Sequence, residues 1–210
     1  TMADPVAEIS ADPIYSCAGD MIELAKAISD RYMPKSVGYY DIFIDDENLT
    51  EQLAPKATRD ETEIIYGDSY MPRKFKIGLT VPENNSVDVF SQDVGIVALR
   101  GEDGSLRGYN ILVGGGLGHS HNKPETYPRV GSPFGFVKPE DVLDVIHAII
   151  TIQRDYGDRT DRKQARLKYL VDRVGLDWFR EEVQRRSGKQ LVSYEPIAKW
   201  DVDDHLGWHD

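Results

Sequence analysis

The chain has 210 residues, is 40% hydrophobic and 29% charged, and carries a net charge of −11, because 36 acidic side chains outnumber 25 Lys and Arg. This composition predicts a globular protein of one large or two small domains, and its acidity argues against a nucleic-acid partner. The absence of an 18-residue apolar run excludes a membrane-spanning helix. The single cysteine, Cys17, excludes an internal disulfide and a four-cysteine metal site within this chain, so we expect a reducing compartment.

One segment departs from this acidity. Residues 154–189 carry 11 basic and 7 acidic side chains, a local excess of four positive charges. An acidic protein with one basic segment favours a small anionic ligand. The alternative is a helix whose charged face is simply solvated.

The N-terminal half is predicted to contain one helix and then strands. The helix is expected from an apolar stripe at helical spacing, and the strands from runs of aromatic and β-branched residues. In chain order we expect a helix over Ile14–Tyr32, a strand over Val37–Ile44, a surface loop over Asp45–Glu63, a strand over Phe75–Val81, and a hairpin of Gly95–Arg100 with Leu106–Val113.

The C-terminal half is predicted to be helical after a polar, turn-rich segment over Leu117–Phe136. The expected helices run from Pro139 to near Tyr156, from Asp161 to Gly175 and from Trp178 to Ser187, before an extended tail over Tyr194–Asp210. Asp161 followed by Gln164 is a capping-box pattern, which places the start of the second of these helices. Strands grouped before helices predict an α+β fold.

A cluster of cations opens one predicted strand, in Pro72-Arg73-Lys74-Phe75-Lys76. Alternate strand residues share a face, so Lys74 and Lys76 are expected on one side and Arg73 on the other. Two ammonium groups about 7 Å apart repel by roughly 2 kcal/mol at an effective dielectric of ~20, which invites an anion between them. Lysines also protect exposed edge strands against aggregation, and the motif alone fits both interpretations.

The glycine run Gly114–Gly118 follows a strand but does not match the dinucleotide pattern, and no helix follows it. Glycines there are expected to let the backbone approach a flat ligand or another chain closely. His119 and His121 could share a metal, but no carboxylate or cysteine at ligand spacing completes the site, so no metal ligand is assigned.

The predicted helix that begins at Asp161 places Arg162, Arg166 and Arg173 along one side of its apolar stripe. Guanidinium groups in such a row suit carboxylates or phosphates. An ordinary amphipathic helix with solvated arginines explains the same pattern.

Four segments together resemble the assimilatory sulfite reductase haemoproteins, of the nitrite and sulfite reductase family. They are Y-M-P-R-K-F-K at 70–76, V-G-G-G-L-G at 113–118, Q-R-D-Y-G-D-R-T-D-R-K at 153–163 and L-G-W at 206–208. The segments occur in the family's order, and the resemblance runs from about Ile14 to Trp208. The tail P-I-A-K-W with L-G-W is more similar to the ferredoxin-dependent branch than to the NADPH-dependent one.

The resemblance implies a mixed, mainly antiparallel sheet with helices packed on it, and a six-electron reduction of sulfite to sulfide at a sirohaem bridged to a [4Fe–4S] cluster. It implies that Lys74 and Lys76 reach the bound anion. It also implies that Arg73, Lys163 and Arg166 lie by the sirohaem carboxylates. Related nitrite reductases usually have asparagine at the position of Lys76, so the lysine favours sulfite. The remaining alternatives are a nitrite reductase and a non-catalytic module that binds an anion or a tetrapyrrole.

The chain lacks the cysteines that hold the iron–sulfur cluster in this family. The family's cluster takes four cysteines, in C-x5-C and C-x3-C pairs, whereas this chain has only Cys17. We therefore expect a central domain over residues 1–193 and a linker over residues 194–210, with further domains before and after it. This piece alone is expected to be inactive and to bind no cofactor. The expected partners are sulfite, ferredoxin as electron donor and the other domains, in the cytoplasm or, for a plant-type source, the plastid.

Overall fold

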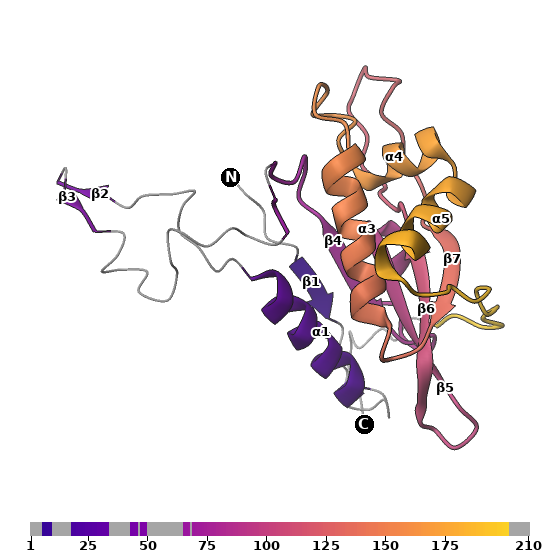
Figure 1. Cartoon of the computed structure of the whole chain (residues 1–210). Coiled ribbons are helices and arrows are strands. Elements are labelled where there is room, and N and C mark those ends of the chain that lie inside the picture. Colours follow the sequence, from indigo (N-terminus) through magenta and orange to yellow (C-terminus); the bar gives the residue numbers. More distant parts are fainter. Residues whose placement is uncertain are drawn as a thin grey trace, which may run out of the picture.

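A computed structural model describes residues 6–9, 18–33, 43–45, 47–49, 65–67 and 69–201 of the chain. Its main feature is a five-stranded sheet in the order β1-β4-β5-β6-β7 (Figure 1). The five strands are β1 (Val6–Ile9), β4 (Lys76–Thr80), β5 (Val94–Arg100), β6 (Leu106–Val113) and β7 (Ser132–Val137). A separate antiparallel pair joins β2 (Phe43–Ile44) to β3 (Glu47–Asn48).

The sheet is mixed. β4 lies parallel to both β1 and β5, whereas β6 lies antiparallel to β5 and β7 in the longer ladders. The short turn between β5 and β6 forces an antiparallel pair, while β1 and β4 are separated by enough chain for a crossover that includes a helix. The predicted α+β class with a mixed sheet is confirmed.

Helices cover one face of the sheet. They are α1 (Ala18–Tyr32), α3 (Val142–Tyr156), α4 (Leu167–Val174) and α5 (Leu176–Ser187). Alternate residues of β5, such as Ile96 and Ala98, are buried against these helices in the main core. The other residues of β5, Val97 and Leu99, are buried on the opposite face, in a smaller cluster. Both faces of the central strands are therefore covered, which explains their continuous apolar sequence.

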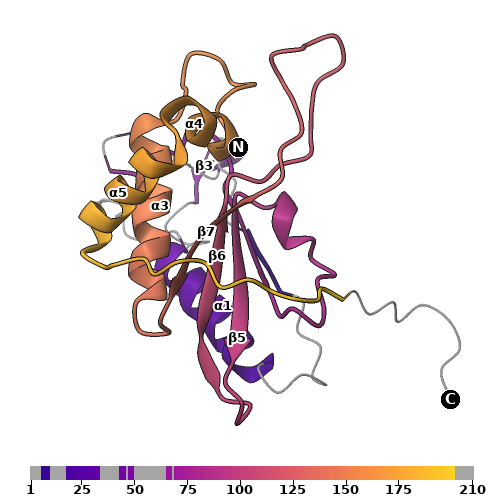
Figure 2. The ribbon, with the colours of Figure 1, turned by 90° about the vertical axis from the view of Figure 1, so that its right-hand side faces the viewer.

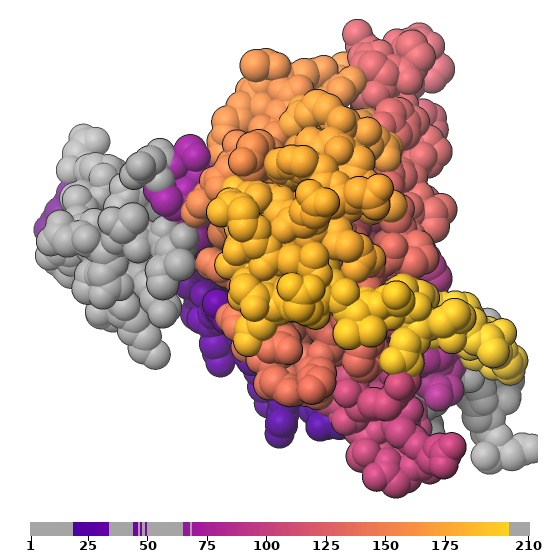
Figure 3. All heavy atoms as spheres, turned by 45° about the vertical axis from the view of Figure 1, so that its right-hand side comes forward, coloured from indigo at the N-terminus to yellow at the C-terminus, as the bar shows by residue number. Residues whose placement is uncertain are grey.

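The opposite face is covered by the short helix η1 (Val89–Ser91) and by the tail after α5. The tail crosses the sheet in extended form: Val192 pairs with Phe136 of β7, Glu195 pairs with the side chain of Asn110 in β6, and Asp201 exchanges backbone hydrogen bonds with the loop after β4. Figure 2 shows this path over the strands, and Figure 3 shows the tail lying along the surface. Residues 202–210 lie outside the described part.

Several predicted elements are confirmed. The strand over Phe75–Val81 corresponds to β4, the hairpin to β5 and β6, and the helix after Pro139 to α3. The last predicted helix is α5, which begins two residues earlier than expected. The first helix is described from Ala18, and the predicted strand over Val37–Ile44 and loop over Asp45–Glu63 lie mostly outside the described residues, as does Cys17.

The predicted start of the helix at Asp161 was wrong, because α4 begins at Leu167. The residues before it form turns. The Asp158 carboxylate accepts the backbone N–H groups of Thr160 and Asp161, and the Asp161 carboxylate accepts the N–H of Lys163 at 2.8 Å. Such local bonds compete with helix formation, and here they prevail.

Strand β7 is absent from the predicted elements, since its residues were assigned to a turn-rich segment. Pro133 and Gly135 interrupt it, and both residue types are unfavourable within strands. Pairing with β6 and burial of Phe134, Phe136 and Val137 outweigh this local preference. No helix in the described part of the chain is long and apolar enough to cross a membrane.

Candidate functional site

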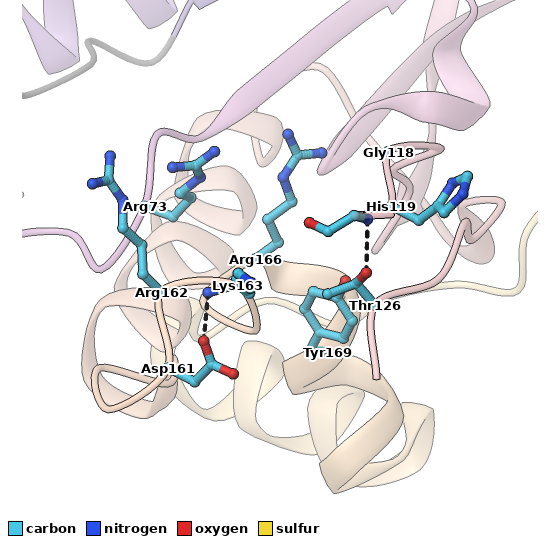
Figure 4. Close-up of a pocket in the computed structure, with 10 residues that line it drawn as sticks. Arg73, Gly118, His119, Thr126, Asp161, Arg162, Lys163, Arg166 and Tyr169 are labelled. Carbon is cyan, nitrogen blue, oxygen red and sulfur yellow. Dashed lines mark hydrogen bonds between the residues drawn. The ribbon is translucent and has the colours of Figure 1, made fainter. Parts of the chain in front are cut away.

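A pocket of about 430 Å³ lies where three loops meet, at the edge of the sheet where β4 begins and β6 ends (Figure 4). Arg73 comes from the segment before β4, and Arg162, Lys163 and Arg166 come from the loop before α4. The remaining lining residues are Gly118, His119, Ser120 and Thr126 from the loop after β6, together with Asp161 and Tyr169. Four cations and a single carboxylate therefore line the pocket, which gives it a positive charge.

The three residues predicted to bind a cofactor, Arg73, Lys163 and Arg166, all line this one pocket. Arg73 lies about 90 residues before Lys163 and Arg166 in the chain, so only the tertiary fold brings it to them. Figure 4 shows the guanidinium groups of Arg73, Arg162 and Arg166 extending toward the same side. Guanidinium groups present paired N–H donors that match carboxylate or phosphate oxygens. The arrangement suits a ligand that carries several anionic groups.

Arg154 and Arg159, at and just after the end of α3, donate hydrogen bonds to the segment that leads to Arg73. Arg159 donates from Nη2 to the carbonyl oxygens of Tyr70 at 2.6 Å and Arg154 at 2.7 Å. Arg154 in turn donates to the carbonyl oxygen of Ile65. These contacts join residues 153–163 to residues 65–73, which places two of the four recognised sequence motifs against each other.

Lys76 is the first residue of β4 and Lys74 lies two residues before it, and neither is among the residues that line the pocket. Phe75, between them, is 3% exposed in the core, while Lys74 is exposed and Lys76 half-buried. This alternation agrees with the prediction that the two lysines face away from Phe75. Because β4 has β1 on one side and β5 on the other, the edge-strand explanation for the lysines does not hold.

The sequence-based prediction missed Asp93, a buried carboxylate behind Lys76. Its Oδ2 accepts the backbone N–H of Lys76 at 3.0 Å. Burial raises the pKa of Asp93 to about 6, against the lowering effects of that hydrogen bond and of the charges on Arg166, Lys76 and Lys168. An aspartate directly before an apolar strand is the only sequence signal that marks this residue.

Lys168 was missed as well. Its side chain is fully buried, and its Nζ donates to the carbonyl oxygens of Gly116 and Gly118, each at 2.9 Å, and of Tyr127. Burial lowers the pKa of the Lys168 ammonium, and the nearby charge of Arg166 adds to this effect. Lys168 therefore fixes the loop after β6 against α4. In the sequence Lys168 lies beside the apolar stripe of that helix, where a solvated lysine is equally common, so the sequence carries little signal of its burial.

The glycine run packs against this chain's own backbone. A Cβ atom on Gly115 would lie 2.3 Å from the carbonyl oxygen of Phe90 and 2.5 Å from that of Gln92, so only glycine fits there. Gly116 exchanges backbone hydrogen bonds with Arg129, and a loop follows. The prediction named a flat ligand or another chain as the partner of these glycines, whereas at Gly115 the close partner is the loop around η1 of the same chain.

The remaining candidates have separate positions. Of the three arginines predicted to share a helix face, Arg162 and Arg166 line the pocket from a loop, and Arg173 donates to the carbonyl oxygen of Tyr156 at the end of α3. His119 lines the pocket. Within the described ranges, no three His, Cys, Asp or Glu side chains are grouped so that they could hold a metal ion.

Comparisons with known proteins agree with the motifs. The family model described as "Nitrite and sulphite reductase 4Fe-4S domain" matches residues 23–191. The sulfite reductase [NADPH] hemoprotein beta-component of Geobacillus kaustophilus is 46% identical over 189 residues, which cover 90% of this chain and 32% of that protein. The protein of the same description from Leptospira biflexa is 41% identical over 199 residues, 95% of this chain and 34% of its own length.

A solved structure, that of the Mycobacterium tuberculosis NirA protein, is similar with a TM-score of 0.52 and 26% sequence identity. The match covers 75% of this chain and 27% of that one. The chain thus spans about a third of the length of the curated relatives it matches.

Proposed function

Because the chain belongs to the nitrite and sulfite reductase 4Fe-4S domain family, we propose that it is the central part of an assimilatory sulfite reductase. The overall reaction adds six electrons and six protons to sulfite and releases sulfide and three water molecules. The observation that carries the proposal is the pocket in which Arg73 meets Arg162, Lys163 and Arg166. The names of the relatives and the lysine at position 76 favour sulfite over nitrite as the substrate.

The pocket residues fit a sirohaem, whose periphery carries several carboxylates. Arg73, Lys163 and Arg166 are the residues we assign to those carboxylates, and Arg162 adds a fourth positive charge. The residues present do not fit a [4Fe–4S] cluster, because Cys17 is the only cysteine in the sequence. We therefore assign the cluster to residues outside these 210.

When bound, the sirohaem would supply the electrons and the site at which sulfur is reduced. The role we assign to this chain is to bind the anion and to provide protons. Lys74 and Lys76 would neutralise the charge on the sulfite oxygens through their ammonium groups. Each S–O cleavage consumes two protons and two electrons and releases water, and an ammonium group beside the departing oxygen can donate such a proton.

The electron donor has two candidates. The C-terminal motif favours ferredoxin, whereas the names of the bacterial relatives specify NADPH. Steady-state sulfite reduction by the intact enzyme with each donor in turn distinguishes them, and the physiological donor should support the faster turnover.

Lysine variants of the intact enzyme test the proposal. Lys74→Ala and Lys76→Ala should each lower sulfite turnover by roughly 100-fold or more, because charge stabilisation and proton supply are lost together. Lys138→Ala, which removes an exposed lysine just after β7, is the matched control and should leave turnover unchanged. Unchanged turnover in both site variants would contradict the proposed function.

Lys76→Asn, assayed with sulfite and nitrite in parallel, should shift the preference toward nitrite.

A further inference from the structure

A buried carboxylate links the strand that carries Lys76 to the glycine run. Asp93 precedes β5 and is 5% exposed. Its side chain accepts the backbone N–H of Lys76 at 3.0 Å, and its backbone carbonyl accepts the N–H of Gly114 at 2.8 Å. The start of β4 and the end of β6 are thereby tied together at the same edge of the sheet. This is the edge at which the cationic pocket lies.

Three positive charges face Asp93, one from β4 and two from the start of α4. They belong to Lys76, Arg166 and Lys168, and each favours the ionised form of the carboxyl group. Burial opposes them and has the larger effect, so the pKa of Asp93 is raised to about 6. Arg166 lines the pocket directly. The charge on Asp93 therefore changes near neutral pH at a position that acts electrostatically on a pocket residue.

We propose that Asp93 has two roles at this end of the sheet: it is a positioning residue that holds Lys76, outside the pocket, at the start of β4, and its ionisation state sets how strongly the neighbouring cationic pocket binds an anionic group. The inference rests on the proposed function, because it requires that the pocket bind an anionic ligand. An ionised Asp93 offsets part of the positive potential at Arg166, and a protonated Asp93 does not. By reciprocal linkage, proton uptake by Asp93 and anion binding in the pocket favour each other.

The expected size of the effect follows from Coulomb's law. Sulfate, the probe used below, carries two negative charges, so a unit charge about 10 Å away, at an effective dielectric of ~20, changes its affinity by roughly 100-fold or more before screening by salt and by at least about tenfold after it. The measurement therefore belongs at low ionic strength, where screening is weakest. A tenfold change in a dissociation constant is resolved well by calorimetry.

The test measures the binding of inorganic sulfate to the 210-residue chain by isothermal titration calorimetry, at about pH 5 and at about pH 7.5. Sulfate keeps the same charge across this range. His119 also lines the pocket, so every protein compared carries His119→Gln, which leaves no histidine among the lining residues. With Asp93 present, sulfate binding should weaken about tenfold between the lower and the higher pH. With Asp93→Asn the change should be less than about twofold.

A matched control separates this effect from a change in net charge. Asp103→Asn removes the same charge from the exposed turn between β5 and β6, at the opposite end of the hairpin, and should keep the tenfold dependence. Equal pH dependence in the Asp93→Asn protein and its parent would overturn the proposed coupling.

A second readout does not depend on anion binding. The backbone N–H of Lys76 should show a ¹⁵N NMR shift with a midpoint near the pKa of Asp93, about 6, and Asp93→Asn should abolish it. A Lys76 signal that does not change with pH overturns the positioning role. A parent protein that binds no sulfate at either pH, but whose Lys76 signal titrates, overturns the coupling and counts against the carboxylate-binding role proposed for the pocket. Asp93 is then left only as the residue that holds Lys76.

Discussion

The guanidinium of Arg159 donates a hydrogen bond to the carbonyl oxygen of Tyr70 at 2.6 Å, across 89 residues of sequence. Arg159 lies in the run Q-R-D-Y-G-D-R-T-D-R-K, and Tyr70 begins Y-M-P-R-K-F-K. The motif at 153–163 therefore holds the motif at 70–76 in place and also contributes Arg162 and Lys163 to the pocket. Gly157 also packs closely against the motif at 70–76, because a Cβ atom there would lie 2.7 Å from Cγ of Pro72.

Gly157→Ala should destabilise the protein and disturb the position of Arg73. The added methyl group would meet Pro72 and, at 2.4 Å, the carbonyl oxygen of Gln153. Overpacking of this kind costs about 1–3 kcal/mol, measured as the free energy of unfolding in urea. Gly19→Ala is the control: it is exposed in α1 with no atom within 4 Å of the new methyl, and it should stabilise by up to about 1 kcal/mol. Equal effects of the two substitutions would refute the contact.

Lys168→Met should lower the free energy of unfolding by roughly 2–5 kcal/mol, because three carbonyl oxygens lose a charged donor inside the protein. Methionine keeps the length and apolar character of the stem, so packing is largely preserved. Lys123→Met removes an exposed lysine from the same loop region and should change stability by less than about 0.5 kcal/mol. Urea denaturation of both variants provides the comparison, and similar curves would show that the buried ammonium does not fix the loop.

Two carboxylates should change the stability of the protein with pH in opposite directions. The folded-state pKa of Asp93, about 6, lies above its ordinary value of 3.8, so the folded state holds this proton more tightly than the unfolded state. Its contribution to stability therefore falls as pH rises from about 4 to 6, by about 3 kcal/mol for a shift of about two units. Asp93→Asn should remove this decline from pH-dependent thermal unfolding.

Glu182 provides the contrasting case. Hydrogen bonds from Arg185, together with the Arg186 pairing, lower the pKa of Glu182 from 4.5 to about 2. Its contribution is complete above about pH 4.5 and is lost as pH falls toward 2. Glu182→Gln should therefore alter the acid limb of the stability profile and leave the slope between about pH 5 and 7 unchanged. A changed slope in that window would show that the two carboxylates are not distinguished as the structure indicates.

Arg166→Ala and Arg73→Ala in the intact enzyme should reduce retention of sirohaem, read from the haem absorbance per protein, because each variant removes a cation from the pocket. Arg166→Lys keeps the charge and should retain more haem than the alanine variant. Arg185→Ala, on the exposed side of α5, is the control and should bind haem normally. Full haem occupancy with slow turnover in both alanine variants would assign these arginines to the chemistry instead.

Sequence patterns were enough to predict the α+β class, most of the hairpin and helix positions after residue 75, and the family motifs that contain Arg73 and Lys163, with Arg166 close behind them. These features depend on local periodicity and on residue types that occur close together in the chain. They can be predicted because a strand or helix that buries one face has apolar residues at a regular spacing in the sequence.

The features that depend on partners far away in the chain became visible in the folded structure. β7 forms despite Pro133 and Gly135 because β6 offers a partner and Phe134 and Phe136 become buried. The helix expected from Asp161 begins instead at Leu167, since carboxylates capture the intervening N–H groups. The position of β4 inside the sheet, the burial of Asp93 and Lys168, and the meeting of four cations in one pocket all arise from long-range packing and hydrogen bonds, which no local pattern encodes.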